Sequence, residues 1–379
     1  MRLLHTSDWH LGRTLFSVPL IEHQKVFLDW LIEQVDEQSI DAVLISGDVY
    51  DRSVPSVESI ALFEQALIAL AQRSAVVVIP GNHDSATRLG FAGPLLEAAR
   101  VHVRANAKDI ERPIVVTSGS QAVQIFGIPY LEPTFHAEAF GCERTHASVL
   151  NAAMQRIRQS AVADMPVIVV AHAFVTGGQP SESERDVRVG GIPDAPISIF
   201  DGADYVALGH LHRPQELTTQ SQMKARYSGS PIAYSFSEEG QEKSVVILDV
   251  NDESIHVTLL PTPQPRALAT IQGDLDELLS DSMLSPLENH WIRAIVTDER
   301  RPERPMDRLR ERFPHTLQLE FAPAGGGANT GVRAVDISVL SPVEVTTSFI
   351  EYVSGTDVTE TERALIEQAV ERVRLDEVT

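Results

Sequence analysis

Five short segments of this 379-residue chain carry acidic, imidazole and amide side chains directly after short apolar runs. They are Asp8-Trp9-His10, Gly47-Asp48-Val49-Tyr50-Asp51, Gly81-Asn82-His83-Asp84, Ala171-His172 and Gly209-His210-Leu211-His212. Ligands of α/β proteins gather outside the carboxyl ends of the strands, so segments far apart in the sequence can meet at one site. Oxygen and imidazole ligands without thiolate suit a borderline metal ion such as manganese, iron or zinc.

The order of these residues predicts a centre for two metal ions, with Asp48 as the bridging carboxylate. The other expected ligands are, for the first ion, Asp8, His10 and His212 and, for the second ion, Asn82, His172 and His210. Two such cations can clamp a phosphate oxygen, activate a water molecule and stabilise the leaving oxygen. The pattern therefore predicts phosphoester hydrolysis.

A further group with chemical potential is His83, which adjoins Asn82 but is not needed for coordination. We interpret His83 as the catalytic donor of a proton to the leaving alkoxide, with Asp84 orienting its ring. Asp51 has two explanations, support of the bridging carboxylate or a cap on the helix that follows, and we favour the first.

Each segment alone also has an explanation without chemistry. Asp-x-His is commonly a turn at a strand end, and Gly-Asp-x-x-Asp can be a loop, because Gly and Asp favour turns. Gly-Asn-His-Asp and Gly-His-x-His are more specific. The five segments in order, each after an apolar run, favour a metal site over coincidence. The isolated residues His5 and His23 are interpreted as hydrogen-bonded scaffold residues.

Apolar runs that alternate with helical patterns predict a layered α/β architecture up to about residue 260. Strands are expected at residues 42–45, 75–79, 123–128, 167–170, 205–208 and 245–250. Helices are expected at residues 22–35, 57–71 and 147–157. The first two helices have an apolar face to bury against a sheet.

Three prolines, Pro261, Pro263 and Pro265, interrupt this pattern, so we place a domain boundary there. The expected domains are residues 1–262, a small α+β domain at residues 266–324, and a helical hairpin at residues 341–379. In the small domain, strands are expected at residues 267–271, 291–296 and 316–321, and helices at residues 275–284 and 306–312. A linker containing Gly325, Gly326 and Gly327 precedes the hairpin.

The hairpin has clear helix boundaries. Ser341 with Glu344, and Thr359 with Glu362, have the spacing of a capping box, and Gly355 is expected to end the first helix. Such a pair has too little core to stand alone, so its apolar residues should either pack on the body of this chain or face a partner helix. The glycine-rich linker favours the partner helix. The apolar residues are Phe349, Tyr352, Leu365, Ile366 and Val370.

Composition narrows the classes of protein that remain. The chain has no run of about 20 apolar residues, so no membrane span is expected, and its first residues do not have the pattern of a secretion signal. The single cysteine, Cys142, suits a reducing cytoplasm. The net charge of −22 is unusual for an enzyme of nucleic acids, so we expect weak affinity for DNA alone.

The five segments resemble the calcineurin-like metallophosphoesterase superfamily, and flanking residues narrow the resemblance to the SbcD family of bacterial nuclease subunits. The matching stretches are residues 1–12 (MRLLHTSDWHLG), Glu22-His23-Gln24, Phe27-Leu28-Asp29-Trp30, Gly209-His210-Leu211-His212-Arg213-Pro214-Gln215 and Ser228-Gly229-Ser230-Pro231. They cover about the first 240 residues. The later domains are similar to that family in their order alone.

The resemblance implies a four-layer α/β/β/α sandwich, dependence on manganese, and cleavage of DNA as an exonuclease on ends and an endonuclease on hairpins and single strands. It also implies a homodimer within a heterotetramer, with the small domain contacting DNA and the hairpin docking on the SMC-like ATPase SbcC in DNA repair and recombination. The seven expected ligands and His83 all match the family pattern. Residues 341–379 hold nine acidic and three basic residues, so docking is expected to be apolar with an acidic rim.

Two other functions fit the metal motifs. A phosphatase or small-molecule phosphodiesterase could use the same centre, because the metal site alone does not select the substrate. The stretch Gly47-Asp48-Val49-Tyr50-Asp51-Arg52 is even similar to the protein-phosphatase form of this motif. A non-catalytic scaffold on the same fold is the third possibility, and the intact ligand set argues against it.

Overall fold

Two compact units make up the computed structural model of this chain, Met1–Ala324 and Gly325–Thr379. The structure describes residues 1–184, 195–251, 254–322, 341–354 and 358–376; within them, the side chains of residues 342, 352–354 and 371–376 are left undescribed. Within these ranges no helix is long and apolar enough to cross a membrane.

The first unit contains two six-stranded sheets. The first sheet has the order β14-β13-β1-β4-β5-β6, and β1, β4, β5 and β6 run parallel. Its strands are β1 (Arg2–Thr6), β4 (Ala42–Ser46), β5 (Ala75–Ile79), β6 (Val101–Val103), β13 (Ser244–Val250) and β14 (Ile255–Pro261). The antiparallel strands β13 and β14 complete one edge.

The second sheet has the order β11-β12-β10-β9-β8-β7. Its four central strands are parallel, and an antiparallel strand closes each edge. The strands are β7 (Ile114–Ser118), β8 (Gln121–Ile128), β9 (Val167–His172), β10 (Tyr205–Gly209), β11 (Gln215–Leu217) and β12 (Lys224–Tyr227). The expected strands of both sheets are confirmed, with small changes at their ends.

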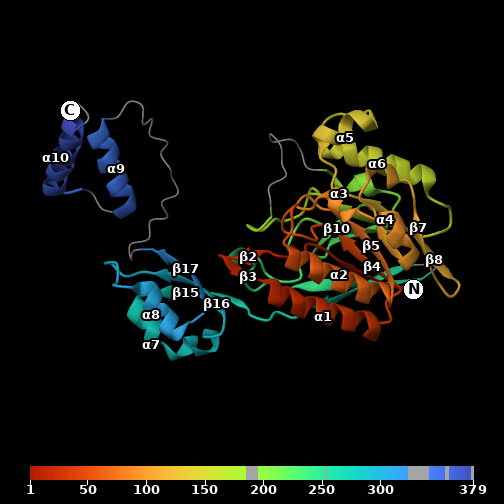
Figure 1. Cartoon of the computed structure of the whole chain (residues 1–379), viewed down its shortest axis with the longest axis horizontal. Coiled ribbons are helices and arrows are strands. Elements are labelled where there is room, and N and C mark those ends of the chain that lie inside the picture. The colour runs from red at the N-terminus through yellow and green to blue at the C-terminus, as the bar shows by residue number, and fades with distance from the viewer. Residues whose placement is uncertain (185–194, 252–253, 323–340, 355–357, 377–379) are drawn as a thin grey trace. The chain divides into compact units, whose positions relative to one another are not determined.

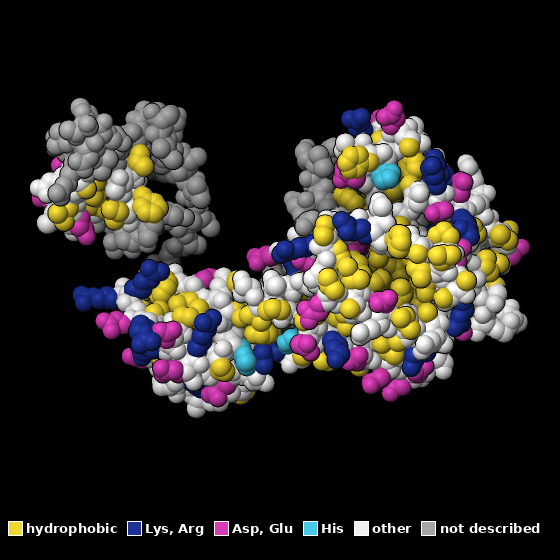
Figure 2. All heavy atoms as spheres, viewed as in Figure 1, with side chains coloured by type: hydrophobic (Ala, Val, Ile, Leu, Met, Phe, Trp, Pro, Cys, Tyr) yellow, Lys and Arg dark blue, Asp and Glu magenta, His cyan; other side chains and the backbone are white. Residues whose placement is uncertain are grey.

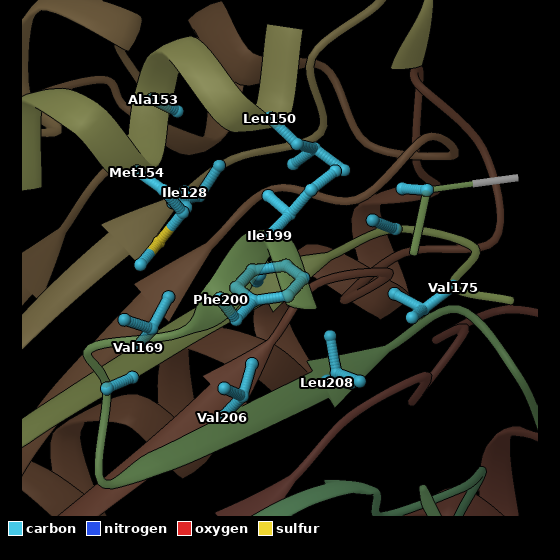
Figure 3. Close-up of a cluster of buried hydrophobic side chains, with 14 of the residues drawn as sticks. Ile128, Leu150, Ala153, Met154, Val169, Val175, Ile199, Phe200, Val206 and Leu208 are labelled. Carbon is cyan, nitrogen blue, oxygen red and sulfur yellow. The ribbon is translucent and has the colours of Figure 1, made fainter. Parts of the chain in front are cut away.

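Helices cover the outer faces of the two sheets. Side chains such as Leu44 and Ile168 form a core between the sheets. On the first sheet, α1 (Ile21–Glu37) and α2 (Val57–Ala71) bury a second core. On the second sheet, α5 (Pro133–Phe140) and α6 (His146–Ser160) bury a third core, in which Leu150 and Met154 face Val169 and Val206 (Figure 3). The architecture is therefore the expected α/β/β/α sandwich (Figure 1).

The central strands are apolar on both faces because each lies between two cores. Every residue of β4 and β5 is buried, which is why these strands read as continuous apolar runs in the sequence. The remaining short elements are β2 (Thr14–Leu15), β3 (Val18–Pro19), α3 (Ala86–Leu89), α4 (Gly93–Leu96) and 3-10 turns at Glu97–Ala99, Ala107–Asp109, Ile197–Phe200 and Phe236–Glu238.

A three-stranded parallel sheet follows, with strands β15 (Leu268–Gly273), β16 (Trp291–Val296) and β17 (Thr316–Phe321). Helices α7 (Leu275–Ser280) and α8 (Pro305–Arg312) cover it and share its own core around Leu309 and Phe313. The helix expected at residues 275–284 ends earlier, at Ser280. A 3-10 turn at Ser282–Leu287 replaces its last residues, because Asp281 has an extended backbone and its side chain accepts the Met283 N–H at the start of that turn.

The second unit contains α9 (Pro342–Ser354) and α10 (Glu360–Asp376), which contact each other. Both expected capping boxes are confirmed. The Ser341 N–H donates to Glu344 Oε2 at 2.7 Å, and the Thr359 N–H donates to Glu362 Oε2 at 2.9 Å. The expected linker glycines at residues 325–327 and the expected helix stop at Gly355 lie outside the described residues.

The apolar residues of the hairpin are only partly as expected. Phe349 and Leu365 are 63% and 62% exposed, which agrees with the expectation that they face a partner. Ile366 is buried instead, because an apolar side chain facing the neighbouring helix of a hairpin packs inside it. Val370 is half-buried, and the side chain of Tyr352 lies outside the described residues.

Candidate metal centre

The expected ligands meet at the carboxyl ends of five parallel strands, three in the first sheet and two in the second. In the first sheet, Asp8, Asp48 and Asn82 follow β1, β4 and β5, which are direct neighbours. In the second sheet, His172 ends β9 and His210 follows the adjacent β10. The centre therefore lies where the two sheets face each other.

The structure contains three groups of buried side chains that could each hold an ion. Within each group, the ligand atoms lie within 4.8 Å of one another. These groups are Asp8 with His10 and His212, Asp8 with Asp48 and His172, and His10 with Asp48 and His83. Asp8, His10 and Asp48 each belong to two of the groups, so the three groups overlap in one cluster. Asp48 Oδ2 is 3.5 Å from both His10 Nε2 and His172 Nε2.

Asn82 and His210 join the same cluster through short contacts. Asn82 Oδ1 lies 3.0 Å from His172 Nε2 and 3.1 Å from His210 Nδ1. The His210 N–H donates to Asp8 Oδ1 at 3.0 Å. The structure thus brings all seven expected ligands together. Whether they hold ions stays a prediction.

Four of the seven ligands have backbone conformations that side chains rarely adopt. The φ angles are 54° at Asp8, 44° at His10, 49° at Asp48 and 111° at His210. Two interlocking loops hold this conformation: the Asp8 N–H donates to the Gly47 carbonyl at 3.0 Å, and the His10 N–H donates to the Asp48 carbonyl at 2.9 Å. Strain of this kind concentrates at functional sites.

The glycines of the motifs make this close approach possible. Gly47, Gly81 and Gly209 each stand directly before a ligand. A Cβ atom on Gly81 would lie 2.1 Å from Asp48 Oδ1, and one on Gly209 would lie 2.0 Å from the Ser46 carbonyl oxygen. A larger residue at either position would displace the bridging carboxylate or the loop that carries His210.

Three imidazoles of the centre, those of His10, His172 and His210, are held in the neutral form that binds metal. Burial, reinforced by neighbouring imidazoles, lowers the pKa of His10 and of His210 well below the usual range. Burial also lowers the pKa of His172, although the Asp48 carboxylate opposes it. A neutral ring keeps a lone pair for an ion at neutral pH.

Acidic side chains are crowded in the same buried space. The described contacts of Asp8 and Asp48 are with hydroxyl, backbone N–H and imidazole groups. Burial, and then the Asp48 charge, raise the pKa of Asp8 well above its usual range and that of Asp84 to about 7. Divalent cations would offset this negative charge, so the residues present fit a metal pair.

His83 lies beside the ligands in a fixed orientation. Its ring packs edge-on against His10, with centroids 4.6 Å apart, and its Nδ1 lies 2.8 Å from the Asp51 carbonyl oxygen. The His83 N–H donates to Asp48 Oδ1 at 2.9 Å. His83 also falls within reach of the ion that His10 and Asp48 could share, or its ring can stay free of metal.

Asp84 has a different set of contacts from the one expected. Its carboxylate accepts three backbone N–H groups, those of Val49, Tyr50 and Gly81. It therefore ties the loops after β4 and β5 together, and the Asp51 carbonyl orients the His83 ring. The partner of the His83 ring is therefore the Asp51 carbonyl and not the expected Asp84 carboxylate, because the Asp84 oxygens already accept the three backbone N–H groups.

Asp51 lies next to the centre and does not cap the helix that follows. The cap of α2 is Ser56, whose hydroxyl accepts the Ser59 N–H. Asp51 Oδ1 lies 3.7 Å from His10 Nδ1 and 3.5 Å from Arg13 Nη1. Its carboxylate thus lies beside His10 rather than beside the bridging residue that we expected, at a distance too long for a hydrogen bond to the ring.

The structure confirms the hydrogen-bonded scaffold role expected of His5, whereas the contact that it shows for His23 is with an aromatic ring. His5 is buried, and its ring nitrogens each lie 3.1 Å from an oxygen, the Tyr205 hydroxyl and the Leu208 carbonyl. Burial lowers the pKa of His5 to about 3. His23 packs against Trp291, with ring centroids 5.7 Å apart.

Gln24 is a residue of the site that the motifs did not reveal. Its Nε2 donates to the carbonyls of Trp9 and His10 at 3.1 and 2.7 Å, and its Oε1 accepts the Gly12 N–H at 3.0 Å. It therefore holds the loop that carries Asp8 and His10. A signal was present, because Gln24 is a polar residue on the apolar stripe of α1 that includes Phe27.

The surroundings of His212 were also missed. Its N–H donates to Glu184 Oε1 at 2.6 Å, and its ring contacts Ser183, which in turn contacts Glu238. These residues belong to no motif, and their spacing in the sequence gives no signal.

We predict that Gly81→Ala lowers metal content while leaving the fold intact, because the added Cβ would overlap the Asp48 carboxylate. Gly273→Ala is the matched control, since its Cβ would meet neighbours at ordinary distances of 3.4 Å or more. Metal per chain, measured by plasma mass spectrometry after dialysis against manganese, should fall for Gly81→Ala alone. Equal metal content in the two variants would contradict the role of Gly81.

Comparison with known structures gives distant relatives. The protein TT1561 of Thermus thermophilus is 12% identical over 68% of this chain and 98% of that chain, with a TM-score of 0.40. A dimetal phosphatase from Danio rerio is 10% identical over 70% of this chain and 97% of that chain, with a TM-score of 0.39. An archaeal phosphodiesterase is 14% identical over 69% of this chain and 100% of that chain, with a TM-score of 0.31.

Two family models match the sequence. The model described as calcineurin-like phosphoesterase matches residues 1–214, which carry all seven candidate ligands and are more than half of the chain. The SbcD C-terminal model, described as type 5 capsule protein repressor C-terminal domain, matches residues 264–354. The chain therefore belongs to the calcineurin-like phosphoesterase family, and its second match makes it an SbcD-like member of that family.

Proposed function

We propose that this chain is the nuclease subunit of a complex that processes DNA ends, cleaving phosphodiesters as an exonuclease on double-strand ends and an endonuclease on hairpins and single strands. The observation that supports this most is the convergence of seven oxygen and imidazole ligands beside His83, six of them buried and Asn82 half-buried. The family itself consists of metal-dependent phosphoesterases. DNA as the substrate is the proposal.

The ligands would hold two divalent ions, and we propose manganese because the centre offers oxygen and imidazole without thiolate. Such ions, when bound, polarise the phosphate and activate water. Asp48 sits between the two ligand groups and would keep them at a fixed separation. The strained loops after β1 and β4 hold the ligand atoms in place before any ion arrives.

His83 would donate the proton that the leaving oxygen needs. The Asp51 carbonyl fixes its ring through Nδ1, so Nε2 remains to carry the proton to the substrate. The ring packs edge-on against His10, and the His83 backbone N–H donates to the Asp48 carboxylate, which fixes the backbone that carries the ring. Asp84 would act by fixing the loops and not by touching the substrate.

The domains after the sandwich favour DNA over a small substrate. We propose the division into residues 1–262, 266–324 and 341–379, with the second domain contacting DNA. The second domain supplies eight arginines among its 59 residues, although its net charge of −3 (8 − 11) is, per residue, about that of the whole chain at −22 over 379. Lys and Arg side chains are visible around this sheet in Figure 2. A small-molecule esterase or a non-catalytic scaffold gives no role to these residues.

We infer the partners of this chain from its exposed apolar surfaces, which a partner would cover. We propose that the hairpin docks on the SMC-like ATPase SbcC through Phe349 and Leu365, which are largely exposed. A second copy of the chain would cover the exposed side chains of α2 and α4, among them Ile60, Ile68 and Leu95, where hydrophobic side chains gather (Figure 2). The resulting heterotetramer would act on chromosomal DNA in the cytoplasm, in repair and recombination.

Substrate selection is tested by a panel of blunt, hairpin and single-stranded DNA together with a chromogenic phosphomonoester and phosphodiester, all with manganese. We expect cleavage of single-stranded DNA by the chain alone, and of double-strand ends only with the ATPase and ATP. Asp48→Asn should be inactive on every substrate, because the bridging carboxylate is lost. Hydrolysis of the small esters without cleavage of any DNA would favour the alternative enzyme.

His83→Ala should keep both ions and lose about 10² to 10⁴ in the rate of DNA cleavage, the usual effect of removing a general acid. His136→Ala is the control, because that residue lies on α5 outside the cluster. Metal content and single-turnover cleavage would be measured on the same samples. Depletion of an ion from His83→Ala would show that the residue is a ligand instead.

The hairpin surface is tested by Phe349→Ser with Leu365→Ser, compared with Phe135→Ser, a similarly exposed residue of α5. We expect the double variant to lose binding to the ATPase in a pull-down while single-stranded DNA is still cleaved. Removal of residues 340–379 should have the same effect. Full binding by either protein would overturn the assignment of the hairpin.

A further inference from the structure

The ring of His212 contacts the candidate metal centre on one side and a buried polar network on the other. His212 Nε2 lies 3.0 Å from His10 Nε2, inside the group of ligand atoms that could hold the first ion. On the opposite side, His212 Nδ1 lies 2.5 Å from Ser183 Oγ. Ser183 Oγ is also 2.5 Å from Glu238 Oε1.

A buried ion pair anchors this network. Lys243 Nζ lies 2.5 Å from Glu238 Oε2, and neither side chain is accessible to solvent. Lys243 also donates to the His212 carbonyl at 2.8 Å and to Ser230 Oγ at 3.1 Å. Burying two charges is costly unless their hydrogen bonds are satisfied, so this pair requires a specific role or a specific set of partners.

The donors and acceptors of the network determine which ring nitrogen of His212 carries the proton. Glu238 faces the Lys243 ammonium and accepts hydrogen bonds only. The single hydroxyl proton of Ser183 is therefore donated to Glu238. The contact between the Ser183 oxygen and His212 Nδ1 can then be a hydrogen bond only with Nδ1 as the donor. This places the proton of a neutral His212 on Nδ1 and leaves the lone pair on Nε2, the nitrogen that faces His10.

Residues 234–239 hold Glu238 in place from both directions. Tyr234 packs on the rings of His10 and His212, with centroid distances of 5.6 and 5.7 Å. Glu239, at the other end, accepts the N–H and the hydroxyl of Thr270 at 2.9 and 2.6 Å, which attaches the segment to β15. Glu238 is thus fixed in the fold independently of any ion.

We propose that Ser183 and Glu238, supported by Lys243, are positioning residues that hold His212 in the tautomer and orientation needed to bind the first metal ion. The proposal rests on the proposed function, because it takes the centre to bind divalent ions. Partners of metal-bound histidines of this kind typically change metal affinity by about 10- to 100-fold when they are mutated.

The test is manganese binding by the full chain, measured by isothermal titration calorimetry, with circular dichroism melts on the same samples. Ser183→Ala and Glu238→Gln should each weaken the first-ion affinity by about 10- to 100-fold. Ser183→Thr keeps the hydroxyl and should restore binding. Glu97→Gln is the control, because Glu97 is also paired with two cations, Arg104 and Arg112, outside this cluster.

The outcomes of this test distinguish the proposed metal centre from the proposed positioning role of Ser183 and Glu238. Parental protein that binds no manganese would contradict the proposed metal centre itself. Parental binding together with unchanged affinity in folded Ser183→Ala would overturn the positioning role alone. If Glu238→Gln does not fold, Ser183→Ala with its threonine rescue carries the test, since it removes one hydroxyl and leaves the ion pair in place. Equal losses in Ser183→Ala and Ser183→Thr would also contradict the proposal, because a lost hydroxyl could not explain them.

Discussion

Burial of two carboxylates in one cluster is the constraint on which the rest of the site depends. Asp8 and Asp48 are withdrawn from water, and the first has a strongly raised pKa because of burial and the second charge. Like charges in a low-dielectric interior repel strongly, so positive charge that enters the cluster would stabilise its ionised form. Neutral imidazoles around them supply lone pairs and no charge. A pair of divalent cations satisfies both requirements.

The sandwich brings these groups together without relying on flexible loops. Strands buried on both faces fix the starting points of the ligand loops in each sheet, and parallel pairing aligns their carboxyl ends. Positive φ angles then turn the side chains inward at once. Glycines before the ligands allow the two sheets to approach closely at this edge. Precision at the site therefore comes from the most rigid part of the fold.

Much of this was predictable because it is local. Apolar runs identified the strands, and capping boxes identified both hairpin helices. Contacts between distant residues were not predictable: the sequence does not show that the Asp51 carbonyl, and not the Asp84 carboxylate, meets His83. No pattern in the sequence indicates the Ser183–Glu238 contact either. Ile366 was misplaced because periodicity gives the stripe of a helix but not which of its members the neighbouring helix covers.

Diffraction at the manganese absorption edge, from crystals grown with the ion, tests the central claim most directly. The account predicts two anomalous peaks, one on each side of the Asp48 carboxylate, with His10 and His212 at the first and Asn82, His172 and His210 at the second. A single peak, or peaks away from Asp48, would contradict the two-metal centre.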